Sequence, residues 1–337
     1  MIKVTSSIDW NKWDNFVYSH PKGNIFQTSY MARVYELTQN YEPVSLAVVD
    51  QESNDIIAIL QAVIVQQMGG VLSLFSSRSI IYGAPIFDEE NENIEAVRTL
   101  MEHYEKLISN KVIYTEIRNM WDTWQIGSIL DQSGYSFTDH FNALIDLNKP
   151  IDELWNQLKR DKKRGIKRSE ELGITIETCQ SKESIKIFYE LVKETYNRAK
   201  VPLAPISFFE AAFEVLVPKQ KALLLFAKDT SNNIIATQFA LMYKDRIYAW
   251  YTGSREEFLK FHPGDALIWY LLKYGKEQGY KVFDFGGGGG PNKNENLREY
   301  KSRFGTEFPC YGRYEKTYSE TRSRIASTGL KIYKRLI

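Results

Sequence analysis

Five consecutive glycines, followed by a lysine among aromatic residues, form the part of the sequence best suited to chemistry. The glycines, Gly286–Gly290, come directly after the apolar run Val282–Phe285. A glycine backbone has no side chains, so its amide groups can approach a ligand closely and positive φ angles cost little. Lys301 follows, between Tyr300 and Phe304. Because an ammonium group beside such amides can stabilise a developing oxyanion, these residues predict a site that holds an anion or an oxyanion.

The candidate donors to this oxyanion are the amide groups beside Gly286, Gly287 and Gly288, together with the ammonium group of Lys301. Asp284 lies at the end of the apolar run. Its carboxylate could accept the proton of an attacking amine, or it could order the glycine segment, and both alternatives stay open. Glycine runs also serve as flexible connectors, so the glycines alone do not establish a site.

A second cluster of charge lies in the segment Ile151–Leu172, which we expect to be helical. Its basic residues fall within ten positions and are Lys159, Arg160, Lys162, Lys163, Arg164, Lys167 and Arg168. Such a cluster is typical of a solvated helix face, but it also fits a partner that carries phosphates. The candidate residues for binding such a partner are Lys163, Arg164 and Lys167.

The elements that must position these residues occur twice in the chain. After helices at Trp10–Ser19 and Thr28–Gln39, the first copy is expected as strand, strand, strand, helix and strand at Val44–Val49, Ile56–Val65, Ile80–Pro85, Ile94–Ser109 and Val112–Ile117. The second copy has the same order at Ala222–Ala227, Ile234–Tyr243, Ile247–Gly253, Asp265–Gln278 and Val282–Phe285. Even the hairpin turns match, with Ser53–Ala58 similar to Ser231–Ala236. We therefore expect a repeated α/β unit.

The segment Asn148–Pro150 is the expected boundary between the copies, so we predict domains at 1–147 and 148–318, the second carrying the site. Residues 319–337 predict a basic amphipathic helix. Such a helix can lie on a membrane surface, but more often it packs on its own protein.

Composition indicates an ordinary globular protein, with 43% hydrophobic and 25% charged residues and a net charge of +1 over 337 residues. The two cysteines, Cys179 and Cys310, and the absence of CxxC or HExxH spacings predict neither a disulfide framework nor a metal site. The first residues lack the layout of a signal peptide, and the longest apolar run, Ile56–Val65, is about half of a membrane span. We therefore expect a cytoplasmic protein.

The residues after the second copy resemble a known family signature. Asp284–Gly287, Leu297, Tyr300-Lys301 and Phe304-Gly305 look like the closing signature of the FemABX aminoacyltransferases and their BioF2-like acyltransferase relatives, in the GNAT superfamily. Further pieces that agree are Phe26-Gln27, Tyr41–Pro43, and Lys163–Arg168 leading to Gly173-Ile174. The resemblance covers nearly the whole chain. It implies an α/β fold with mixed sheets, built as two tandem GNAT-like domains, with the C-terminal helix returning to the first domain.

The resemblance also implies roles for single residues. Lys301 matches the family lysine that stabilises the tetrahedral intermediate, with Tyr300 and Phe304 as candidate substrate contacts; the position of Tyr300 is usually Phe. Arg33 falls where the peptidoglycan branch has a basic residue that faces the phosphates of the precursor. Ala204 stands where that branch has an arginine, a departure that argues against a nucleotide-linked acceptor.

The ordinary GNAT cofactor loop would fall at Lys260–Ala266, which has only one glycine of the pattern. Gly264 and Ala266 are the candidate cofactor contacts, since backbone amides at a helix start can hold a phosphate. Pro263, Gly264 and Asp265 are equally explained as helix-capping residues. We expect no tightly bound cofactor, only a co-substrate.

The predicted function is an N-acyltransferase that moves an aminoacyl or acyl group to an amine of a cell-envelope glycan or peptide precursor. Aminoacyl-tRNA is the favoured donor because the basic segment suits an RNA backbone. An acyl-CoA-dependent transferase acting on an amino sugar of a surface polysaccharide is the alternative, and a non-catalytic module that binds RNA or a partner is the third. No DNA partner is expected, and at most peripheral contact with a membrane.

Overall fold

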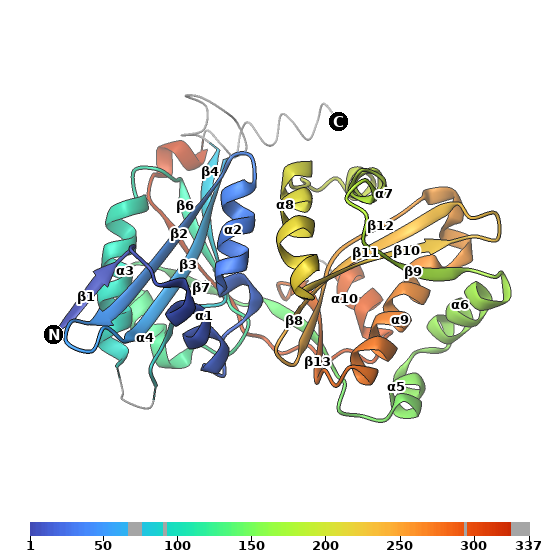
Figure 1. Cartoon of the computed structure of the whole chain (residues 1–337), viewed down its shortest axis with the longest axis horizontal. Helices are drawn as coiled ribbons and strands as arrows, with labels where there is room; N and C mark the ends of the chain where they lie inside the picture. The colour runs from blue at the N-terminus through green and yellow to red at the C-terminus, as the bar shows by residue number, and fades with distance from the viewer. Residues whose placement is uncertain (67–75, 90–92, 293–294, 325–337) are drawn as a thin grey trace. The chain divides into compact units, whose positions relative to one another are not determined.

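The computed structural model describes residues 1–66, 76–89, 93–292 and 295–324, and the chain folds into two compact units (Figure 1). Unit 1 comprises Met1–Asp139 together with the segment that starts at Tyr311, and unit 2 comprises His140–Cys310. The middle of the chain is therefore one unit, inserted between two parts of the other.

Unit 1 is built on a mixed sheet. Its strands are β1 (Ile2–Thr5), β2 (Tyr41–Asp50), β3 (Ile56–Gln66), β4 (Ser77–Tyr82), β6 (Tyr114–Arg118), β14 (Arg313–Thr317) and β7 (Ser136–Thr138), hydrogen-bonded in that order, with β5 (Ile86–Phe87) paired to β3. Strands β4 and β6 are parallel, and the other described pairs are antiparallel. Strand β14 fills the place between β6 and β7, so the chain returns to unit 1 to complete its sheet.

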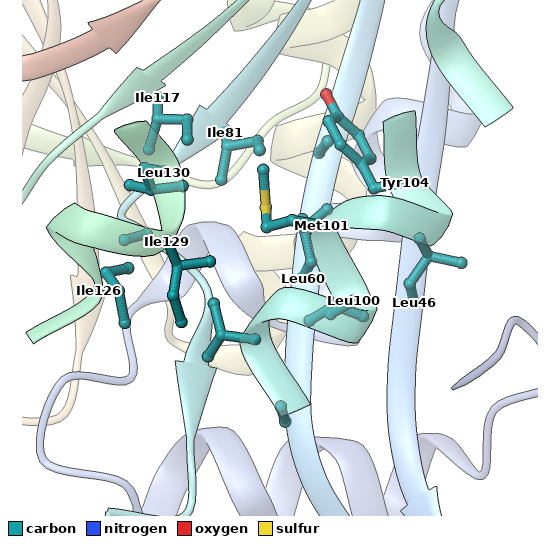
Figure 2. Close-up of a cluster of buried hydrophobic side chains, with 14 of the residues drawn as sticks. Leu46, Leu60, Ile81, Leu100, Met101, Tyr104, Ile117, Ile126, Ile129 and Leu130 are labelled. Carbon is teal, nitrogen blue, oxygen red and sulfur yellow. The ribbon is translucent and has the colours of Figure 1, made fainter. Parts of the chain in front are cut away.

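One face of this sheet carries the main core of unit 1. Helices α3 (Ile94–Ile108) and α4 (Trp124–Gln132) cover it with apolar side chains. Figure 2 shows Leu100 and Met101 of α3 and Ile129 of α4 among residues of the strands. The remaining helical segments of unit 1 are α1 (Trp10–Ser19), the 3₁₀ turn η1 (Ile25–Gln27) and α2 (Ser29–Leu37). Helices α1 and α2 contact β3 and β2.

Unit 2 repeats this plan. Its strands are β8 (Phe141–Asp146), β13 (Val282–Gly289), β12 (Arg246–Ser254), β11 (Ile234–Tyr243), β10 (Ala222–Lys228) and β9 (Thr175–Cys179), again in sheet order. Strands β12 and β13 form the parallel pair. Helix α9 (Pro263–Glu277) lies over the face whose core includes Ala240, Leu271 and Phe283.

The other helical segments of unit 2 are α5 (Ile151–Gln157), α6 (Arg160–Glu171), α7 (Ser184–Ala199), α8 (Ile206–Leu216), η3 (Val217–Lys219), η4 (Glu256–Phe261) and α10 (Glu295–Ser302). Side chains alternate between the faces of a strand. Phe239 of β11 therefore points away from α9, and its ring contacts Phe188 of α7. An aromatic layer with Phe209 of α8 and Trp250 of β12 fills this second face.

The repeated order of strands and helices is confirmed, but three expectations differ in detail. The strand expected to stop at Phe285 continues as β13 to Gly289. The basic segment Ile151–Leu172 is not one helix but two, because Leu158 and Lys159 have extended backbones between α5 and α6. The expected boundaries at 147 and 318 also differ from the observed ones, since β8 joins the sheet of unit 2 and β14 joins that of unit 1.

The expected terminal helix is described only at its start. Residues 320–324 are helical, and the side chain of Arg322 donates a hydrogen bond to the carbonyl of Asn110 in unit 1, at 3.2 Å. Residues 325–337 lie outside the described part of the chain, so the predicted packing of that helix stays a prediction.

Candidate active site

The two parallel strands of unit 2 pair over only a short length. Arg246, Ile247 and Tyr248 of β12 are in register with Val282, Phe283 and Asp284 of β13, and no further pair joins these strands within the described residues. Both strands continue, β12 to Ser254 and β13 to Gly289. They therefore separate at their carboxyl ends, which is where ligands bind in open α/β sheets.

The parallel pair of unit 1 behaves differently. Strands β4 and β6 stay paired from Arg78 and Tyr114 through Tyr82 and Arg118, to the last residue of each strand. A separation of parallel strands like that in unit 2 is therefore absent from this described pair. The separation of parallel strands in unit 2 makes this unit the candidate for the active site; that it carries the site stays a prediction.

The glycine segment is an ordered part of β13 and not a flexible connector. Gly286 and Gly289 have positive φ angles of 77° and 80°, which glycine adopts readily. A side-chain carbon at Gly288 would lie 3.1 Å from Phe141. The side chain of Arg298, on α10, donates hydrogen bonds to the carbonyls of Gly288 and Pro291, at 3.1 and 2.9 Å. The segment is fixed on both sides.

Lys301 reaches back from α10 to this segment. Its side chain is buried, and Nζ donates hydrogen bonds to the carbonyl of Phe285 and to that of Gly287, the latter at 2.8 Å. Burial lowers the pKa of Lys301 to about 8, and the nearby Asp284 carboxylate partly opposes this shift. An ammonium has three donors, and these two bonds use two of them. The structure thus brings the predicted lysine and glycines together.

Asp284 holds the same segment from the other side. One carboxylate oxygen accepts a hydrogen bond from the amide of Gly286 at 2.8 Å, and the other lies 3.2 Å from a guanidinium nitrogen of Arg246. The side chain is buried. Of the two alternatives for Asp284, the ordering of the glycine segment is what these contacts provide. A role as general base stays a prediction.

A buried ion pair that the sequence analysis did not predict lies beside Tyr300 of α10 and Phe304. Nζ of Lys162 lies 2.8 Å from a carboxylate oxygen of Asp265 and 4.1 Å from the ring centre of Tyr300. The Tyr300 hydroxyl donates to the same carboxylate, and burial together with Asp265 raises the pKa of Tyr300. Phe304 packs in the core of unit 2 below this pair, with Lys162 4.9 Å from its ring centre.

Comparisons with known proteins agree with this geometry. A family model described as "Acetyltransferase (GNAT) domain" matches residues 156–302. This match lies within unit 2. That range includes the separating strands, the glycine segment and Lys301. A search of curated proteins found no match.

Solved structures extend the similarity to both units. FemX is 18% identical, with 94% of this chain and 97% of that chain covered and a TM-score of 0.72. L-PGS from Bacillus licheniformis is also 18% identical, with 95% and 96% covered and a TM-score of 0.58. A tandem GNAT protein from the clavulanic acid biosynthesis pathway is 10% identical, with 95% and 99% covered and a TM-score of 0.60. The predicted tandem GNAT fold, the resemblance to FemABX proteins and the acyltransferase class are confirmed.

The start of α9 is the place where the GNAT cofactor loop was expected, and it is closely covered. A side-chain carbon at Gly165 of α6 would lie only 2.7 Å from Asp265 and 3.0 Å from His262. The first turn of the helix, where a phosphate would be favoured, already holds the carboxylate of Asp265, which is ion-paired with Lys162. Gly264 and Ala266 lie half-buried at this turn. Their role as cofactor contacts stays a prediction.

The outward face of α6 carries the remaining basic residues of the cluster. Arg164 and Lys167 are exposed, while Nζ of Lys163 donates to the carbonyl of Asn156 at 3.1 Å. Lys162 differs because it lies on the inward face with Ile166. Its spacing from Ile166, one helical turn, is the sequence signal that could have separated it from its neighbours.

Arg33 is the one predicted site residue that lies in unit 1. It is exposed on α2, and its guanidinium group lies 2.6 Å from the carboxylate of Glu36, one turn along the same helix. The structure describes each unit by itself, so a joint site of Arg33 with the residues of unit 2 stays a prediction.

Two further observations concern the described residues only. No group of three or more histidine, cysteine, aspartate or glutamate side chains has an arrangement that could hold a metal ion among them. None of their helices has the length and apolar character needed to cross a membrane.

Proposed function

We propose that this chain is an N-acyltransferase that uses aminoacyl-tRNA as donor and an amine of a cell-envelope precursor as acceptor. The observation that carries the choice of donor is the arrangement of α6 against α9. The inner face of α6 packs on His262 and Asp265 at the helix start where a CoA pyrophosphate would be expected, and the Lys162–Asp265 ion pair lies there. The outer face of α6 displays cations to solvent.

An RNA backbone suits that outer face. Phosphate contacts from lysine and arginine supply most of the affinity in non-specific nucleic-acid binding, and they do not require a shaped pocket. Arg164 and Lys167 are exposed and lie three residues apart, on one side of the helix. Neither residue takes part in an ion pair among the described residues.

The chemistry of the site fits attack of an amine on an ester. A carbon–nitrogen bond forms while the ester carbon–oxygen bond breaks, and the amine proton is passed to solvent or to the leaving oxygen. Negative charge builds on the carbonyl oxygen during this step. Lys301, which is held beside Gly286 and Gly287, would stabilise such charge, and one preorganised donor can contribute about 3 to 4 kcal/mol. No covalent nucleophile is needed.

The acceptor class rests on the resemblance to FemABX proteins. A cell-envelope precursor with a free amine is the acceptor that this resemblance implies. Ala204 lacks the charge that would contact a nucleotide diphosphate, so the proposal favours an acceptor without that group. The same proposal includes a cytoplasmic location, where charged tRNA is present.

The test is a discharge assay with the purified protein, bulk charged tRNA and an added amine acceptor, run beside the same assay with acetyl-CoA. We expect deacylation of tRNA only when acceptor is present, and its loss in Lys301→Ala, with the circular dichroism spectrum unchanged. Consumption of acetyl-CoA without discharge of tRNA would overturn the choice of donor and favour the amino-sugar acyltransferase.

The basic face of α6 is tested by the double variant Arg164→Gln with Lys167→Gln. It should weaken tRNA binding and reduce the slope of log affinity against log salt by roughly 1 to 2, since about 0.7 to 0.9 is lost per phosphate contact. The matched control is Lys186→Gln with Lys193→Gln, which removes two exposed charges from α7 in the same unit. Equal effects of the two double variants would contradict a specific role for α6.

A further inference from the structure

Unit 1 contains an arginine that has no carboxylate partner among the described residues. Arg78 starts the parallel pairing of β4 with β6, opposite Tyr114. Ser79 and Ile81 point to the core under α3, so alternation places Arg78 on the opposite face of the sheet. The described ion pairs include none with Arg78, and its Nε is buried without a hydrogen-bond partner among the described residues.

The corresponding arginine of unit 2 is paired. Arg246 starts the parallel pairing of β12 with β13, and Asp284 lies two residues further along the neighbouring strand. These two side chains form an ion pair at 3.2 Å. The internal repeat therefore provides a direct comparison for Arg78.

By the same register, the carboxylate that corresponds to Asp284 in unit 1 is Glu116, two residues after Tyr114. It is already used. Arg118 donates to Glu116 through Nε and Nη2, at 3.0 and 2.8 Å, and Arg313 of β14 donates to its other oxygen. Two guanidinium groups thus share one carboxylate, and Arg78 is left over.

The surroundings of Arg78 are polar and only half-buried. Its Nη1 lies 3.5 Å from the hydroxyl of Tyr114, and Arg118 lies over the ring of Tyr82 at 5.2 Å. Burial raises the pKa of Tyr41, whereas Arg78 and Arg118 both act to lower it, so these groups lie close together. Glu315 of β14 is the other carboxylate on this face, in register with Glu116. Among the described residues of these three strands, the guanidinium groups of Arg78, Arg118 and Arg313 therefore face two carboxylates, those of Glu116 and Glu315.

We propose that this face of β4 and β6 in unit 1 binds an anionic group, a carboxylate or a phosphate, on the guanidinium of Arg78. A half-buried guanidinium group without a carboxylate partner costs stability, and an anion supplies the missing partner. Guanidinium groups bind carboxylates and phosphates through paired hydrogen bonds. Tyr41, Tyr82 and Tyr114 would surround the rest of the ligand with aromatic edges and hydroxyl groups. This inference does not rest on the proposed transfer reaction.

The test is calorimetric titration of the full chain with inorganic phosphate and, separately, with acetate. We expect saturable binding of at least one anion, weakened at least tenfold in Arg78→Gln. The matched control is Arg98→Gln, an exposed arginine of α3 in the same unit that is ion-paired with Glu95. Binding of phosphate alone would assign a phosphate ligand, and binding of acetate alone a carboxylate ligand.

A second variant keeps the proposal falsifiable if the first one is poorly folded. Glu116→Gln releases Arg118 and Arg313 from their shared carboxylate, so it should tighten anion binding several-fold. Thermal melting should show the same order, because a ligand that binds only the folded state raises the midpoint of unfolding. Absence of binding in the parent protein, or binding that Arg78→Gln and Arg98→Gln change equally, would overturn the proposal.

Discussion

At the scale of single residues, Lys301 shows how a fold changes the pKa of a side chain. Two carbonyls of the glycine segment hold the ammonium group, and the surrounding protein excludes water from it. Burial disfavours the charged form, and the pKa falls from 10.5 to about 8. The group is therefore still protonated at neutral pH but close to losing its proton.

This shift predicts a pH dependence of the transfer rate. If the protonated Lys301 stabilises the transition state, the rate should fall as the pH rises through about 8. Below that pH the rate should increase as the pH increases, because more of the acceptor amine has lost its proton. The two effects together give a bell-shaped profile. The measurement is the acceptor-dependent discharge rate against pH, corrected for spontaneous ester hydrolysis. In Lys301→Arg the falling limb should disappear, because a guanidinium keeps its proton; a limb that persists would assign it to another group.

The same pKa shift predicts that the stability of the folded chain increases over the pH range in which the transfer rate falls. The folded chain binds fewer protons at Lys301 than the unfolded chain between pH 8 and 10.5. Stability therefore rises with pH across that window and is lower below it. Function and stability place opposing demands on this residue.

At the scale of elements, regular side-chain patterns were predicted well, and the site-forming elements less well. The strand Ile234–Tyr243 was predicted to the residue, because its apolar pattern and flanking turns are clear. The extension of β13 through Gly289 was missed because glycines carry no pattern, and their strand geometry depends on Asp284 and Arg298 holding them.

The joint between α6 and α9 was also missed, because its charges look like surface charges in the sequence. Lys162 and Asp265 lie 103 positions apart and meet inside unit 2. Removing one partner of a buried pair of this kind strongly destabilises the protein, since the other charge stays buried without its opposite charge.

This joint gives a prediction on stability. Lys162→Met should lower the free energy of unfolding by about 3 to 5 kcal/mol, the usual cost of leaving a buried charge unpaired. Adding Asp265→Leu should recover part of that loss, so the two changes should not be additive. Urea unfolding of the two single variants and the double variant measures the coupling.

A matched control for the joint is Lys182→Met, which breaks an exposed ion pair with Glu214 on the same unit. Exposed pairs contribute little, so this variant should stay close to the parent protein. Strict additivity in the cycle, or an equal loss in the control, would mean that the Lys162–Asp265 pair does not hold α6 to α9.

At the scale of the whole molecule, sequence order did not predict which sheet a strand joins. The repeat was visible, yet β14 follows unit 2 in the sequence and pairs in unit 1 between β6 and β7. This pairing depends on contacts between distant residues. Lys316 of β14 lies 2.7 Å from Glu105 of α3, and the hydroxyl of Tyr318 lies 3.2 Å from that of Thr115 in β6.

This exchange of segments predicts how the two units behave when separated. A fragment of residues 1–139 lacks β14, so β6 loses one of its two neighbours, β7 loses its pairing partner and Glu105 loses its cation. We expect this fragment to remain unfolded, because β6 becomes an edge strand with unpaired backbone groups and the core loses the side chain of Tyr314. Circular dichroism and the dispersion of amide signals in NMR spectra measure the outcome.

The matched control joins residues 1–139 to 311–324 through a short glycine–serine linker. Phe141 and Cys310 form a β-bridge, so the chain enters and leaves unit 2 at neighbouring points, and a few residues can close the gap. The joined chain should fold cooperatively, because it restores β14 and the pairing of Lys316 with Glu105. A folded 1–139 fragment, or a joined chain that stays unfolded, would show that the completeness of the sheet does not decide the stability of unit 1.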